Sequence, residues 1–273
     1  MTTNIVVNGA HGKIVVRTWP NPTARYIALV AHGIGEHSGR YGHVAEHLVA
    51  HGAVVYAPDH LGHGLSDGER ALVRDIDVLA GDLHRVAQLV RATHPALPLV
   101  LVGHSMGGLI ATRFAQLHPG ELAALVLSSP VIGGNPAFEA LLQLDPIPDV
   151  PIDPAMLSRD PAVGAAYAAD DLVYHGPLAR LTLEAIFASG RVVAAGPTLG
   201  ALPTLCMHGE NDVLAPCEPS RAVMARIRGG TLVSKVYAGA AHEIFNETNR
   251  DEVLGDTTAF LDSVLLSPAH GTG

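Results

Sequence analysis

The chain has few cysteines and no cluster of basic residues. Cys206 and Cys217 are the only cysteines among 273 residues, too few for a disulfide scaffold and without the C-x-x-C spacing of redox or zinc sites. We expect both to be reduced. Lys and Arg number 17 against 26 Asp and Glu, which gives a net charge of −9. This acidic balance argues against binding to nucleic acid and against electrostatic attraction to an anionic membrane.

Signals for export and for membrane insertion are also missing. The first residues, MTTN, are not basic, and no apolar core with a small-residue cleavage site follows them. No uncharged apolar run reaches the roughly 18 residues that are needed to cross a bilayer. The sequence therefore predicts a cytoplasmic protein whose only membrane contact would be peripheral.

Apolar runs of strand length alternate with longer segments in which apolar residues recur at helical spacing. Hydrophobic residues make up 48% of the chain and the mean hydropathy is +0.27, which is typical of a globular domain. The strand-like runs are residues 5–7, 14–19, 26–31, 53–57, 99–102, 122–127, 204–209 and 232–237. The first two flank a turn and predict an antiparallel hairpin. The helical segments between the others predict an α/β fold, with a mostly parallel sheet covered by helices on both faces.

This alternation stops between residues 131 and 200. The stretch is rich in proline, has no strand-like run, and contains short helical patches at residues 138–142 and 181–187. We expect an inserted cap, or lid, after the sixth strand, at residues 131–200, between two parts of one core, residues 1–130 and 201–273. The apolar residues of the cap would either line a substrate channel or only pack the cap onto the core. Residues 267–273 are expected to form a frayed tail.

Residues 103–107, GHSMG, fit the pattern G-x-S-x-G between a strand-like run and a helical segment. In a nucleophile elbow, this pattern turns a strand sharply into a helix and exposes the serine hydroxyl above the sheet. Glycines are needed there because a side chain would collide with neighbouring backbone. The alternative is an ordinary glycine-rich turn, so the interpretation depends on finding partners for Ser105.

A serine hydroxyl needs a histidine base, and that histidine needs an acid to fix its tautomer. Asp212 follows the strand-like run at 204–209, and His242 follows the run at 232–237. The order Ser105, Asp212, His242 is that of the α/β-hydrolase triad. All three residues would lie beyond the carboxyl ends of parallel strands, where open α/β sheets place their sites.

The chain has sixteen histidines and several other acids, so rivals exist for both partners. His104 is next to the serine but would point away from it in an elbow. Four further histidines belong to loops near the site, without H-E-x-x-H or comparable spacing, and we predict no metal there: His32, His37, His60 and His63. Asp59 precedes the elbow and Asp170 falls in the predicted cap, so Asp212 is the favoured acid.

Two further segments carry a resemblance to a known family. Residues 32–41, HGIGEHSGRY, and residues 59–66, DHLGHGLS, together with the elbow resemble the monoglyceride lipases of the α/β-hydrolase fold, grouped with lysophospholipase-like serine hydrolases. The similarity covers nearly the whole core and is weakest in the predicted cap.

The resemblance implies that Ser105 attacks an ester carbonyl, that His242 transfers the proton and that Asp212 orients His242. It also implies an oxyanion hole made by the backbone N–H groups of Ile34 and Met106, with no cofactor and no metal.

Four other positions bear on the substrate. Glu36 and Arg40 resemble residues near the alcohol-binding end of the family's site, and a structural ion pair is their alternative role. Ile34 is bulkier than the alanine or leucine that is often found there, and Phe245 replaces a histidine of the mammalian members. The predicted function is hydrolysis of monoacylglycerols, a small-molecule lipid ester, through an acyl-enzyme. The alternatives are a short-chain carboxylesterase or lysophospholipase, and a catalytically inactive α/β-hydrolase that binds a ligand.

Overall fold

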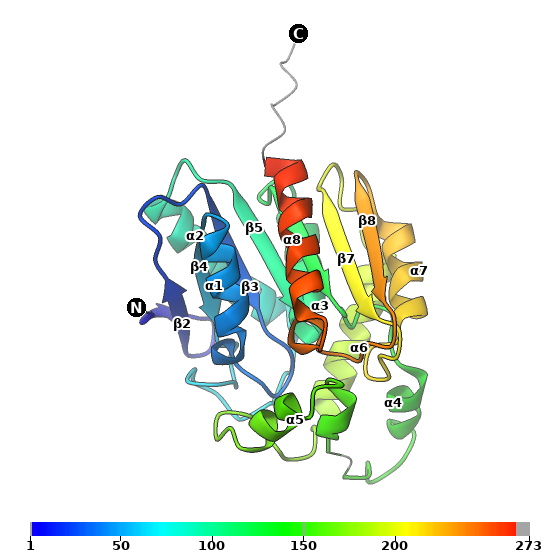
Figure 1. The fold of residues 1–273 in the computed structure, drawn as a ribbon. Coiled ribbons are helices and arrows are strands. Elements are labelled where there is room, and N and C mark those ends of the chain that lie inside the picture. Colours follow the sequence, from blue (N-terminus) through cyan, green and yellow to red (C-terminus); the bar gives the residue numbers. More distant parts are fainter. Residues whose placement is uncertain (1, 150, 266–273) are drawn as a thin grey trace.

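The computed structural model describes residues 2–149 and 151–265 and is built around an eight-stranded sheet (Figure 1). The strand order is β1-β2-β4-β3-β5-β6-β7-β8. The strands are β1 (Thr3–Asn8), β2 (Lys13–Trp19), β3 (Tyr26–Ala31), β4 (Ala53–Pro58), β5 (Leu99–His104), β6 (Ala124–Ser128), β7 (Thr204–Gly209) and β8 (Leu232–Tyr237). β1 and β2 form the predicted hairpin, β2 pairs antiparallel with β4, and all later pairings are parallel. The predicted mostly parallel sheet is confirmed.

The central strands are apolar throughout because both of their faces are covered. Every residue of β3, β4, β5 and β7 is buried. Successive side chains of a strand point to opposite faces. Accordingly, Val100 and Val102 of β5 pack into one apolar core and Leu99 and Leu101 into another. A strand buried on both sides reads as a continuous hydrophobic run, as this one does.

Helices form a layer on each face of the sheet. The helices are α1 (Gly42–Ala50), α2 (Ile76–Thr93), α3 (Met106–Leu117), α4 (Pro136–Leu141), α5 (Pro161–Ala168), α6 (Arg180–Ala195), α7 (Cys217–Ile227) and α8 (Arg250–Leu265). The short 3-10 helices are η1 (Ser38–Tyr41), η2 (Pro154–Met156) and η3 (Ile244–Asn246). Residues of α1 and α8 share one core, and residues of α2, α3 and α7 share the other. Figure 1 shows α1 and α8 together on the near face.

The chain between β6 and β7, residues 129–203, is called here the β6–β7 segment. Its described residues contain α4, η2, α5 and α6 and no strand. Figure 1 shows α4 and α5 beyond one end of the strands rather than on a face of the sheet. Ile186 and Val193 of α6 belong to the main apolar core, so the last helix of the segment also packs against the sheet's helices.

Helix starts in this segment carry clear local signals. Asn135 and Asp160 each accept a hydrogen bond from the backbone N–H two residues later, and proline follows each of them at the first helical position. A capping side chain satisfies a free N–H, and proline loses nothing where no N–H partner exists.

Some boundaries differ from the expected ones. β6 begins at Ala124 rather than at Leu122, and α6 extends to Ala195, well beyond the patch at residues 181–187. The expected tail at 267–273 lies outside the described residues. In the described part of the chain, none of the helices combines the length and apolarity needed to cross a bilayer.

Candidate active site

Ser105 lies between β5 and α3 with a strained backbone, at φ 54° and ψ −120°. Two glycines make this turn possible. A Cβ at Gly103 would lie 2.4 Å from the carbonyl oxygen of Gly107, and a Cβ at Gly107 would lie 2.1 Å from that of Ala31. Both distances are far below any real contact, so only glycine fits at these positions. Close packing against β3 therefore holds the serine in a conformation that costs of order 1–3 kcal/mol.

The structure brings the three residues of the predicted triad into one hydrogen-bonded chain. Nδ1 of His242 lies 2.8 Å from Oδ2 of Asp212, and Nε2 of His242 lies 2.9 Å from Oγ of Ser105. The other oxygen of Asp212 accepts hydrogen bonds from the backbone N–H groups of Leu214 and Ala215. With the carboxylate fixed in this way, Nδ1 of His242 carries the proton and Nε2 is free to accept the hydroxyl proton.

The electrostatics of the three residues suit this arrangement. Burial lowers the pKa of His242, but the charge of Asp212 and its hydrogen bond outweigh burial, so that the pKa is raised above its ordinary value. Burial opposes the charge of Asp212, and the partnership with His242 nevertheless lowers the pKa of this carboxyl. Asp212 therefore stays charged and stabilises the imidazolium that forms when His242 accepts a proton.

The rival residues are held in other contacts. His104 pairs through Nδ1 with Oγ of Ser128, and burial with the nearby His242 lowers the pKa of His104 to about 4. Asp59 accepts hydrogen bonds from the backbone and hydroxyl of Ser38 and from the N–H of Leu65.

Ile34 and Met106 both line the cavity that contains Ser105. Met106 is the first residue of α3, where an N–H has no partner within the helix and the helix dipole favours negative charge. Within residues 2–149 and 151–265, neither N–H donates a hydrogen bond to another protein group. Both donors are thus free to bind an oxygen atom of a ligand.

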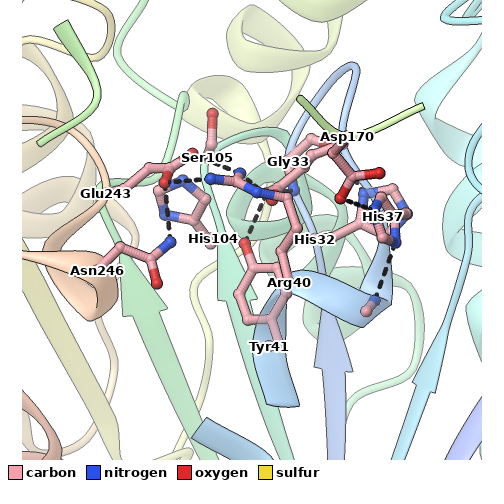
Figure 2. A network of polar contacts seen from close by, with 12 residues as sticks. His32, Gly33, His37, Arg40, Tyr41, His104, Ser105, Asp170, Glu243 and Asn246 are labelled. Atoms are coloured by element: carbon pink, nitrogen blue, oxygen red, sulfur yellow. Dashed lines mark hydrogen bonds and ion pairs between the residues drawn. The ribbon is translucent and has the colours of Figure 1, made fainter. Parts of the chain in front are cut away.

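The loop of residues 32–41 is called here the HG loop. A buried ion network connects it with Glu243, the residue after His242 (Figure 2). Glu36 accepts hydrogen bonds from the N–H of Gly33 at 2.7 Å and from the hydroxyl of Tyr41 at 2.6 Å. Arg40 contacts Glu36 at 2.7 Å and both oxygens of Glu243 at 2.6 and 2.7 Å. Burial would raise the pKa of Glu36, but the charge of Arg40 in particular lowers it to about 2. The ion pair that we considered for Glu36 and Arg40 is present, and it includes Glu243, which sequence reasoning missed.

The HG loop also contacts the β6–β7 segment. Nε2 of His37 lies 2.9 Å from Oδ2 of Asp170, and the carbonyl of Gly35 accepts a hydrogen bond from the N–H of Tyr174 at 2.7 Å. Figure 2 shows Asp170 beside His37 and apart from Ser105. Asp170 therefore belongs to the connection between these two segments and not to the triad.

Metal-ligating side chains converge at a place that sequence reasoning missed. Among the described residues, the group that could hold a metal ion is His84, His118 and Glu121, at the end of α3 opposite Ser105. Nε2 of His84 lies 3.0 Å from Oε1 of Glu121, and the two imidazoles stack 3.6 Å apart. The buried His32, His60 and His63 instead pack against one another.

A cavity lies over Ser105 and His242 and is walled largely by apolar side chains. It contains about 720 Å³ of space free of protein atoms, part of it open to solvent. Much of the wall comes from the β6–β7 segment, through Phe138, Ile152, Leu157, Leu178, Leu183 and Phe187. The polar side chains of Glu36, Asn135 and Glu243 also reach this cavity.

Comparison with known proteins gives a consistent picture. The family model described as serine aminopeptidase, S33, matches residues 22–249. A monoacylglycerol lipase of Mycolicibacterium smegmatis is 37% identical over 93% of this chain and 94% of its own length. The monoglyceride lipase of Homo sapiens is 34% identical, covering 89% of this chain and 84% of its own. The crystal structure of a monoacylglycerol lipase from Paleococcus ferrophilus superposes with a TM-score of 0.76 at 27% identity, over 92% of this chain and 98% of that one.

Proposed function

The chain belongs to the S33 family of serine hydrolases with the α/β-hydrolase fold, and on this basis we propose that it hydrolyses monoacylglycerols to a fatty acid and glycerol. The observation that carries the proposal is the hydrogen-bonded chain from Ser105 through His242 to Asp212 on the floor of an apolar cavity. Relatives that are 34–37% identical to this chain over the aligned residues carry the names monoacylglycerol lipase and monoglyceride lipase.

In the proposed reaction, Oγ of Ser105 attacks the ester carbonyl carbon while Nε2 of His242 takes the hydroxyl proton. The carbonyl electron pair moves to its oxygen, which the N–H groups of Ile34 and Met106 stabilise. Each such donor contributes about 3 kcal/mol to lowering the barrier in comparable hydrolases. The tetrahedral intermediate collapses, the C–O bond to glycerol breaks, and the leaving oxygen takes the proton from His242. Water, activated by the same histidine, then releases the fatty acid from Ser105.

The cavity supports a lipid ester in preference to a polar one. Apolar walls above Ser105 provide contacts for an acyl chain, and each buried CH₂ contributes about 0.8 kcal/mol to binding. Glu36, Asn135 and Glu243 are polar residues of the wall, and they would lie near the glycerol end of the substrate. The side chain of Phe245 has no polar atom, so it offers that end no hydrogen bond where mammalian members have a histidine.

We further propose that residues 131–200 act as a cap, or lid, over a core formed by residues 1–130 and 201–273. The apolar side chains of this stretch that face the cavity support a role in holding the acyl chain. Other apolar side chains of the same stretch are exposed, namely Leu144, Met156, Leu181 and Val192. They would provide peripheral contact with a lipid surface that presents the substrate.

The test compares four esters: a long-chain monoacylglycerol, a diacylglycerol, a lysophospholipid and p-nitrophenyl acetate, with an amino-acyl p-nitroanilide added for the peptidase activity in the family's description. The wild type should hydrolyse the monoacylglycerol fastest, and Ser105→Ala should abolish that activity. Turnover of water-soluble esters alone would support a short-chain carboxylesterase, and preference for the lysophospholipid would support a lysophospholipase. A folded protein that hydrolyses none of them and is not labelled at Ser105 by a fluorophosphonate would be a ligand-binding protein.

A further inference from the structure

His32 makes two hydrogen bonds that together determine which ring nitrogen carries its proton. Its Nδ1 lies 2.7 Å from the carbonyl oxygen of Gly33, and its Nε2 lies 2.9 Å from the backbone nitrogen of His60. A carbonyl oxygen can only accept, so Nδ1 carries a hydrogen. A backbone N–H can only donate, so Nε2 presents its lone pair. Both contacts are satisfied by the neutral Nδ1–H tautomer and by no other form of the ring.

The Gly33 carbonyl that His32 holds belongs to the same peptide unit as the N–H of Ile34. The peptide is planar and trans, so its C=O and N–H point in opposite directions. A hydrogen bond that fixes the carbonyl toward His32 therefore also fixes the N–H of Ile34, directed away from His32. Ile34 lines the cavity together with Ser105, and a Cβ at Gly33 would lie 3.2 Å from the Cβ of Ser105.

The neighbouring peptide unit is fixed by a different side chain. Glu36 accepts the N–H of Gly33 and so sets the peptide between His32 and Gly33. That hydrogen bond does not fix the orientation of the next peptide unit, between Gly33 and Ile34, because glycine rotates readily about the intervening bonds. Without the contact from His32, the Gly33 carbonyl could turn into the cavity and withdraw the N–H of Ile34.

We propose that His32 is a positioning residue that holds the Ile34 N–H in place for the oxyanion. The inference rests on the proposed function, since it concerns the same site. His32 is fully buried, and burial lowers the pKa of its ring despite the charges of Glu36 and Asp59, so the neutral form persists at working pH. Protonation would place a second N–H against the N–H of His60.

Two substitutions separate the two hydrogen bonds of His32. In His32→Asn, the amide nitrogen takes the place of Nδ1 and keeps the donor to Gly33. In His32→Gln, the amide oxygen reaches the place of Nε2 and keeps the acceptor for His60, but the donor to Gly33 is lost. We expect His32→Gln to lower kcat about 10²- to 10³-fold with KM within about 2-fold, as for loss of one oxyanion donor. His32→Asn should remain within about 10-fold of the wild-type kcat.

A matched control is His63→Gln. His63 is also buried and packs on His32, but its Nδ1 contacts the carbonyl of Leu61 and not the site. Its kcat should stay within about 3-fold of wild type. Circular dichroism and thermal melting verify that each variant folds. Equal losses of kcat in folded His32→Asn and His32→Gln, or a change in KM alone, would overturn the proposal.

Nuclear magnetic resonance of the wild type with ¹⁵N-labelled histidine tests the premise without any activity. Long-range ring couplings should assign His32 as the Nδ1–H tautomer throughout the pH range of activity. An Nε2–H tautomer or a protonated ring would contradict the proposal even where the variants do not fold. If the wild type hydrolyses no ester, the proposed function fails, whereas an active wild type with unaffected variants disproves only the role of His32.

Discussion

His37 and Asp170, which are 133 residues apart in the sequence, are joined side chain to side chain by Nε2 and Oδ2 at 2.9 Å. The N–H of Gly39 donates to Nδ1 of His37, so Nε2 carries the hydrogen and donates to the carboxylate. Burial opposes the charge of Asp170, but the hydrogen bond from His37 lowers the pKa of this carboxyl. A neutral histidine thus connects the HG loop to the β6–β7 segment.

Asp170→Asn should loosen that connection, because the amide keeps only one acceptor oxygen, whereas the two carboxylate oxygens accept from His37 and from the N–H of Leu172. The cost in stability should be below about 1 kcal/mol, since Asp170 is partly exposed and such pairs are worth little. Limited proteolysis should cut the β6–β7 segment faster than in the wild type, with little change in the labelling of Ser105 by a fluorophosphonate. Asp171→Asn, one residue along the chain, is the control. Equal cleavage rates in wild type and Asp170→Asn would show that the pair does not hold the segment.

The activity should depend on pH through His242. Only the neutral imidazole can accept the proton of Ser105, and the raised pKa keeps the ring protonated to a higher pH than usual. The acidic limb of kcat/KM should therefore have its midpoint above pH 6.5. In Asp212→Asn the charge that raises this pKa is gone, so the midpoint should move to lower pH while kcat falls by about 10⁴-fold. Profiles of kcat/KM from pH 5 to 9 measure the midpoints of the wild type and of Asp212→Asn. The same midpoint in both proteins would contradict the assignment of Asp212.

Acid should destabilise the fold well before its carboxyl groups titrate. Burial lowers the pKa of His63 to about 3, and of His104 and His208 to about 4. In the unfolded chain these rings protonate below about pH 6.5, so their stabilising contribution is complete above that pH and is lost as pH falls toward the folded values. Each of these rings lowers the free energy of unfolding by about 1.4 kcal/mol for every pH unit between pH 6.5 and its pKa in the folded protein.

Thermal melting across pH 4.5 to 8 measures this loss. The melting temperature should be highest near neutral pH and fall steeply below pH 6.5. His63→Gln removes one of the titrating rings and should make the fall shallower. A melting temperature that stays constant down to pH 5 would contradict the neutral, buried state of these histidines.

Arg40→Met should destabilise the protein strongly, because it leaves Glu36 and Glu243 buried without their shared cation. Breaking a buried ion pair on one side costs about 3–5 kcal/mol, which for a chain of this size lowers the melting temperature by roughly 10 °C. Adding Glu36→Gln and Glu243→Gln to Arg40→Met removes the uncompensated charges and should recover part of the loss. If the triple variant is less stable than the single one, packing of Arg40, and not charge, dominates at this position.

The elbow was predictable from sequence because its strand, its glycines and its helix follow one another directly in the chain. Gly103 and Gly107 are required by contacts of their own Cβ positions, and the strand before Ser105 is apolar because it is covered on both faces. The places of Asp212 and His242 followed from the rule that parallel strands end at one edge of the sheet. Their mutual distances did not follow from that rule and required the structure.

Long-range polar contacts and the helices of the β6–β7 segment were harder to foresee. Glu243 joins Arg40 across 203 residues, and no spacing in the sequence signals that contact. Helix α5 was missed because residues 161–168 are rich in alanine and carry no apolar stripe, although Asp160 followed by Pro161 marks its start. The end of α6 was missed for the same reason, since small residues interrupt its helical periodicity.

The groups proposed for bond cleavage and the groups that surround the acyl chain come from different stretches of the chain. Ser105, Asp212, His242 and the HG loop all follow strands of the sheet, whereas much of the apolar wall comes from the single stretch between β6 and β7. Replacing this stretch would exchange the wall, provided that the new stretch keeps the contacts with Gly35, His37 and Glu243 that hold the site. A chimaera built at the ends of β6 and β7 would therefore be a direct route to redesigned lipid selectivity.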